Sequence, residues 1–166
     1  MNGIRLRARI LQYISIAMVI ILVVITALLL SENSVSRRSM EEVQNKVISL
    51  FENPRAQESS GRILRKYYGL SDTDFEAVTL YFPVSNMDAE ELLIIKLKDV
   101  SQADMVRAAI EERNETQKGI FEGYAPEQLA LCEAAVTDVR GNYVLYVVHE
   151  DAASIDEAFR AAVKNP

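Results

Sequence analysis

The clearest fold signal in the chain is the sequence AVTDVRGNYVLYVV, residues 135–148. Apolar and β-branched residues lie on both sides of Arg140-Gly141-Asn142, and Gly-Asn is a typical two-residue turn of a β-hairpin. This stretch therefore predicts two antiparallel strands, 135–139 and 143–148, joined by a tight turn.

A second pair of strands is predicted upstream, over residues 76–83 and 92–98. In the later strand Leu93, Ile95 and Leu97 share one face while Lys96 and Lys98 share the other, which is typical of a half-buried strand.

Helical patterns follow both pairs of strands. A long helix is predicted from Ser101 past Phe121, a short one over 127–134 and a last one from Ser154, with capping boxes at Ser101/Asp104 and Ser154/Glu157. The order is hairpin, helix, hairpin, helix. It predicts an α+β domain with a four-stranded antiparallel sheet whose helices cover one face.

An uncharged apolar run, ILQYISIAMVIILVVITALLL, occupies residues 10–30. As a helix it would be about 30 Å long, the thickness of a membrane's hydrocarbon core. A cleavable signal peptide is the alternative, but its apolar region is usually about 7–15 residues and ends in a small-residue cleavage site. We therefore expect an uncleaved signal anchor, a single transmembrane helix over 10–30.

The flanks of this run predict its orientation. Arg5, Arg7 and Arg9 precede it, and basic residues beside a membrane span favour the cytoplasmic side. We expect residues 1–9 to be a cytoplasmic tail and the rest of the chain to be extracytoplasmic, on the outer side of the cell membrane.

Residues 31–61 combine a helical pattern with a linker. Met40, Val43, Val47 and Phe51 recur at helical spacing, and Asn53-Pro54 ends the pattern. Two interpretations remain open: a juxtamembrane stalk that forms a homodimer, or a helix that lies on its own domain or on the lipid surface. We expect the folded domain to span residues 62–166.

Composition argues against several function classes. After residue 30 the chain carries 15 basic and 24 acidic side chains, a net charge of −9 that disfavours nucleic acid as a partner. A single cysteine, Cys132, and a single histidine, His149, exclude intrachain disulfides and multi-cysteine or two-histidine metal sites. We expect no metal, no cofactor and no enzymatic activity.

The long predicted helix carries the candidate site. Arg113 and Gln117 lie on the same helical stripe as Ile110 and Phe121, where polar side chains are costly unless they have partners. They either hold a loop or pair with an acid, or they line a groove in which the arginine binds a carboxylate or phosphate beside Tyr124. The candidate ligand- or partner-binding residues are Arg113, Gln117, Phe121 and Tyr124.

The same residues carry a resemblance. The pattern Arg113-x₃-Gln117-x₃-Phe121-x₂-Tyr124-x-Pro126-x-Gln128, with the later Gly-Asn-Tyr-Val at 141–144 and the closing helix, covers about residues 66–163. It resembles an uncharacterised bacterial family, found mainly in Firmicutes, of membrane-anchored or lipoprotein extracytoplasmic domains known as a domain of unknown function. The resemblance implies an extracytoplasmic location and no assigned activity.

Two functional hypotheses follow. We prefer a membrane-anchored, non-enzymatic module of the bacterial cell envelope that binds a protein partner or a small envelope ligand. The alternative is an accessory or catalytic subunit of envelope-polymer modification, for example acylation. A pocket that gathers Arg113, Gln117, Tyr124 and an acid would favour a small ligand, whereas a flat apolar patch would favour a protein partner.

Overall fold

The structure is a computed structural model that describes residues 13–26 and 35–164. The chain divides after residue 34 into two units, and residues 13–26 of the first are helical. Among the described residues, no helix has the length and apolar character needed to cross a membrane. The expected tail 1–9 and the two ends of the expected span 10–30 lie outside the described residues.

The second unit contains a five-stranded antiparallel sheet, in the order β1-β2-β3-β5-β4. The strands are β1 Ala56–Glu58, β2 Ala77–Pro83, β3 Glu91–Lys96, β4 Val136–Arg140 and β5 Tyr143–Val148. Both predicted hairpins are confirmed, and Gly141, with a φ of 58°, forms the turn between the paired residues Arg140 and Tyr143. The expected count of four strands was one short because β1 pairs with the edge of β2.

The helices and strands follow the predicted order. The α-helices of this unit are α2 Met40–Ile48, α3 Gly61–Tyr68, α4 Ala103–Phe121, α5 Pro126–Glu133 and α6 Ala152–Val163, with short 3₁₀ helices η1 Asp72–Asp74 and η2 Val100–Gln102. Hairpin, helix, hairpin, helix is thus the order from β2 to α6, within a mixed α+β fold.

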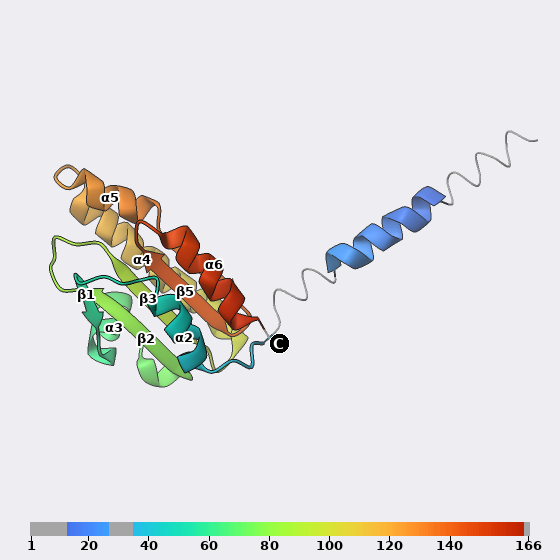
Figure 1. Cartoon of the computed structure of the whole chain (residues 1–166), viewed down its shortest axis with the longest axis horizontal. Coiled ribbons are helices and arrows are strands. Elements are labelled where there is room, and N and C mark those ends of the chain that lie inside the picture. Colours follow the sequence, from blue (N-terminus) through green and yellow to red (C-terminus); the bar gives the residue numbers. More distant parts are fainter. Residues whose placement is uncertain (1–12, 27–34, 165–166) are drawn as a thin grey trace, which may run out of the picture. The chain divides into compact units, whose positions relative to one another are not determined.

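Helices cover both faces of the sheet, which corrects the prediction that they cover one. One core joins the sheet to α3, α4 and α5, and a second core joins it to α2 and α6. Figure 1 shows α2 and α6 together on one side of the sheet. The reason lies in β3 and β5, whose residues are all buried: Leu93 and Ile95 face the first core while Leu92 and Ile94 face the second.

Residues that we expected to precede the domain belong to it. Ser39 and Glu42 form a capping box that begins α2, and Val43 and Val47 are 0% exposed in the second core. The compact unit starts at residue 35, upstream of the boundary expected at 62. Of the two interpretations of this helix, the structure shows the one in which it lies on its own domain. A homodimer would therefore have to use residues other than the apolar face of α2.

Neither predicted capping serine is the N-cap residue of its helix. Asp99 and Gln102 cap the start of η2, which leads directly into α4, so Ser101 is inside the helical segment. The last helix begins at Ala152, two residues before Ser154.

Arg160 on the last helix bridges two acids, one on the same helix and one on the edge strand β4. Arg160 Nε lies 2.8 Å from Asp138 Oδ2 on β4, and its Nη2 lies 2.6 Å from Asp156 Oδ2 on α6. Burial and the neighbouring Asp138 carboxyl raise the pKa of Asp156 to about 6. The folded state therefore binds this proton more tightly than the unfolded state does.

Asp156→Asn is expected to stabilise the protein at neutral pH. With a raised pKa, the stability contributed by the protonated carboxyl is present at low pH and is lost as pH rises through about 6. The difference in free energy of unfolding between Asp156→Asn and the parent should be about 1 kcal/mol more favourable to the variant at pH 7.5 than at about pH 5, after allowance for solvent screening. Urea denaturation at both pH values measures it, with exposed Glu157→Gln as the control. An equal effect at both pH values would contradict the assignment.

Candidate ligand-binding site

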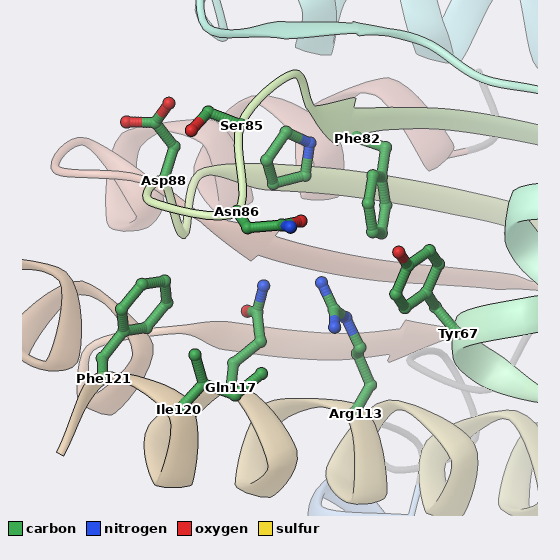
Figure 2. A pocket seen from close by; sticks show the side chains of 10 residues that line it. Tyr67, Phe82, Ser85, Asn86, Asp88, Arg113, Gln117, Ile120 and Phe121 are labelled. Carbon is green, nitrogen blue, oxygen red and sulfur yellow. The ribbon is translucent and has the colours of Figure 1, made fainter.

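A pocket of about 320 Å³ opens between α4 and the loop that joins β2 to β3. This volume is at the lower end of the range for small-molecule sites. Figure 2 shows side chains from α4 on one side and from the loop on the other. The pocket is lined by Tyr67, Phe82, Pro83, Ser85, Asn86, Asp88, Arg113, Gln117, Ile120 and Phe121.

Local structure explains why these residues meet. Arg113, Gln117 and Phe121 recur every four residues and therefore lie on one side of α4, the side that packs toward the sheet. Strand β2 ends at Pro83, whose missing N–H cannot extend the ladder, and the chain then crosses toward α4 before β3 begins. Helix α3 ends at Gly69 in the left-handed region and supplies Tyr67.

A buried ion pair holds the arginine at the base of the pocket. Arg113 is 6% exposed and Glu91, the first residue of β3, is 0% exposed. Arg113 donates to Glu91 Oε2 from Nη2 at 2.9 Å and from Nε at 3.3 Å, and Gln117 Nε2 donates to the same oxygen at 3.2 Å. The Tyr68 hydroxyl donates to Oε1. Four hydrogen bonds thus satisfy a carboxylate that has no access to water.

The electrostatics of this network follow from its burial. Burial raises the pKa of Glu91, and the Arg113 charge together with the hydrogen bonds oppose that rise. For Arg113, burial works against the charged form, but the charge and hydrogen bonds of Glu91 outweigh it and raise the pKa. Burial, followed by the charge of Glu91, raises the pKa of Tyr68. The guanidinium therefore stays charged and the phenol stays a donor at neutral pH.

One edge of the guanidinium remains available to the pocket. Within residues 13–26 and 35–164, no acceptor receives a hydrogen bond from Arg113 Nη1. The guanidinium carbon lies 4.9 Å from the ring centroid of Tyr67 and 5.0 Å from that of Phe82, within the range of cation–π interactions with both rings. In Figure 2 the guanidinium end of the Arg113 side chain points toward the loop that carries Asn86. Arg113 is thus paired with an acid and also lines a pocket.

The structure brings three of the four candidate residues together. Arg113, Gln117 and Phe121 all line the pocket, whereas Tyr124 is 53% exposed and does not. The centroid of the Tyr124 ring lies 6.1 Å from that of the Phe121 ring, so Tyr124 lies next to the pocket but does not form its wall. The sequence reasoning missed Glu91 and the aromatic wall of Tyr67 and Phe82. An acid that opens the apolar strand ELLII was the one available signal for Glu91.

The residues with the best-known catalytic chemistry lie elsewhere. Cys132 is fully buried, burial raises the pKa of its thiol to about 11, and its Sγ lies 3.8 Å from Gln117 Oε1. His149 packs against Phe51 on the other side of the sheet, and its Nδ1 accepts from the backbone N–H of Asp151. Over the part of the chain that the structure describes, no three His, Cys, Asp or Glu side chains gather as metal ligands. The arrangement at Arg113 is suited to binding.

Comparison with known proteins gives the family. Residues 50–149, more than half of the chain, match the family model of a domain of unknown function (DUF4358). The chain belongs to this family. Neither the curated proteins nor the solved structures provide a match. Every residue that lines the pocket lies within the DUF4358 match, and the helical residues 13–26 lie outside it. The pocket is therefore part of the DUF4358 domain itself.

Proposed function

We propose that this protein is a single-pass, membrane-anchored module of the bacterial cell envelope that binds a small ligand without transforming it. The ligand site is the pocket between α4 and the β2–β3 loop. The observation that carries the proposal is the state of Arg113. Its guanidinium is buried, paired with Glu91 and close to two aromatic rings, and the residue lines the pocket. Such preorganised donors bind without first losing side-chain entropy.

Of the acids near the pocket, Glu91 is unsuited to general-base catalysis. A general base has to reach the proton that it removes. Glu91 is fully buried and already accepts four hydrogen bonds. Asp88 does line the pocket, and Arg55 Nη1 lies 3.7 Å from its Oδ1. Among the other polar lining residues, Asn86 and Gln117 carry amides and Ser85 carries a hydroxyl, groups that recognise hydrogen-bonding partners.

A thermal-shift screen of the full chain in mild detergent tests the binding function. The compounds are amino sugars, blocked amino acids and short acyl derivatives. Ile120→Trp fills the pocket, and Met105→Trp is its control because Met105 is on the same helix, is also 48% exposed and does not line the pocket. At least one compound should raise the melting temperature of the parent and of Met105→Trp but not of Ile120→Trp. Equal shifts in all three proteins, or no shift with any compound, would contradict the proposal.

Cysteine labelling tests the proposed membrane topology. It is supported by the uncharged run over 10–30 and by the arginines that precede it. Native Cys132 is buried and should give little background. With an impermeant maleimide, Asn165→Cys should react in intact cells and Asn2→Cys only after permeabilisation. The opposite pattern would show that the orientation is reversed.

A further inference from the structure

The charges around the pocket disfavour an anionic ligand, although an arginine lines it. The charge of Arg113 is already balanced by Glu91, whose Oε2 lies 2.9 Å from Nη2. The one acid among the lining residues, Asp88, is paired as well, with Arg55 Nη1 at 3.7 Å from its Oδ1. Both charged lining residues therefore already have a partner of opposite sign. A carboxylate or phosphate entering here would find no unbalanced cation, would lie near the Asp88 charge and would lose its hydration shell.

The hydrogen-bonding groups of the pocket are of both kinds and lie on opposite sides. The α4 side offers the N–H groups of Arg113 Nη1, which can only donate. The loop side offers the amide of Asn86, which both accepts and donates. Asp88 also belongs to the lining, but its carboxylate points away from α4 in Figure 2. An anion could use only the donors and an ammonium group only the acceptors. An amide uses both, because its carbonyl accepts and its N–H donates.

The remaining walls are apolar. Tyr67, Phe82, Pro83, Ile120 and Phe121 make up half of the lining residues. A ligand that carried only polar groups would leave these walls without an apolar partner, whereas a small apolar substituent would be removed from water against them.

We infer that the pocket binds a neutral amide that carries a small apolar group, and not an anion. This inference rests on the proposed binding function of the same pocket and names the class of its ligand. Two sources share this chemistry, a peptide bond beside an apolar side chain and an N-acylated amino sugar. The apolar walls favour the first.

Three probes that share a phenyl group and differ in their polar group test the inference: phenylacetamide, phenylacetate and phenethylammonium. Ligand-observed NMR titration of the full chain at neutral pH gives their dissociation constants. We expect phenylacetamide to bind at least about tenfold more tightly than either charged probe, a difference of about 1.4 kcal/mol. Its binding should survive in Met105→Trp and disappear in Ile120→Trp. N-acetylleucine methylamide should bind more tightly than N-acetylglucosamine, which separates the two sources.

Asp88→Asn tests the electrostatic part of the argument. The change keeps the side-chain shape and removes one negative charge from the loop side of the pocket, so phenylacetate binding should improve several-fold. Unchanged phenylacetate binding would show that Asp88 does not set the charge preference, and the inference would fail on that ground.

The outcomes separate this inference from the proposed function. If phenylacetate binds as tightly as phenylacetamide, and Ile120→Trp abolishes both, the pocket binds ligands but the amide assignment is wrong. The assignment is also wrong if none of the three probes binds while other compounds of the thermal-shift screen occupy the pocket. If Ile120→Trp abolishes the binding of no compound of any class, the proposed function fails, and the inference fails with it.

Discussion

Arg113→Ala is expected to lower the free energy of unfolding by about 3–5 kcal/mol, because it removes the cation that stabilises the charged form of the fully buried Glu91 carboxyl. The hydrogen bonds from Tyr68 and Gln117 would remain, but they do not balance the charge. Tyr124→Ala is the matched control on the same segment. Tyr124 is half exposed and outside the pocket, so its loss should change stability by no more than about 0.5 kcal/mol.

A second variant keeps this prediction specific to the ion pair. In the Arg113→Ala background, Glu91→Gln removes the unbalanced charge and should recover part of the lost stability, although each change alone is destabilising. Urea denaturation of the four proteins gives the coupling between the two residues. If Arg113→Ala is as stable as Tyr124→Ala, the buried pair does not contribute as described.

Truncation at the boundary suggested by the sequence is expected to abolish cooperative folding. A fragment of residues 62–166 lacks α2, β1 and the segment between them, which together supply four buried apolar residues to the second core: Val43, Val47, Phe51 and Ala56. Leu92 and Ile94 in the middle of the sheet would lose packing partners on that side. A fragment of residues 35–166 retains both cores and should unfold cooperatively.

Thermal unfolding followed by circular dichroism distinguishes the two fragments. A sigmoidal transition is expected for 35–166, and a broad transition with binding of a hydrophobic dye is expected for 62–166. Val47→Asp in the longer fragment is the single-residue version, and Leu50→Asp is its control because Leu50 is nearly half exposed. A cooperative melt of 62–166 would show that α2 and β1 are dispensable for the fold.

The parts of the fold that the sequence predicted are those with local signals. The Gly-Asn turn predicted the hairpin of β4 and β5, because the first central position of such a two-residue turn needs a positive φ, which glycine adopts readily. The stripe of Arg113, Gln117 and Phe121 was also predictable, because helical spacing alone places these residues on one side of α4.

The second core was not predictable from local pattern. An amphipathic helix shows which side is apolar but not what covers it, so α2 fitted a stalk as well as a domain helix. Lys96 suggested a strand with one exposed face, yet its Nζ lies 2.8 Å from Glu76 Oε1 and 5.7 Å from the centre of the Tyr143 ring. Its aliphatic stem is buried while its charge is paired. A lysine in this strand therefore does not indicate an exposed face, and the second buried face could not be predicted from the sequence.

The site depends on contacts between distant residues. Glu91 precedes Arg113 by 22 positions, and a number of other acids were equally eligible as its partner on sequence grounds. The aromatic wall combines Tyr67 from α3 with Phe82 from β2, which meet only through the packing of the sheet on its helices. The pocket is therefore a property of the tertiary structure, although its arginine was visible in the sequence.

A crystal structure of the protein soaked with compounds selected by the thermal-shift screen would show whether the pocket is the ligand site. The compound should lie between α4 and the β2–β3 loop, with an acceptor atom within hydrogen-bond distance of Arg113 Nη1 and its apolar part against Tyr67 and Phe82. Compounds bound at other places, with the Arg113 edge contacting only solvent, would contradict the proposal.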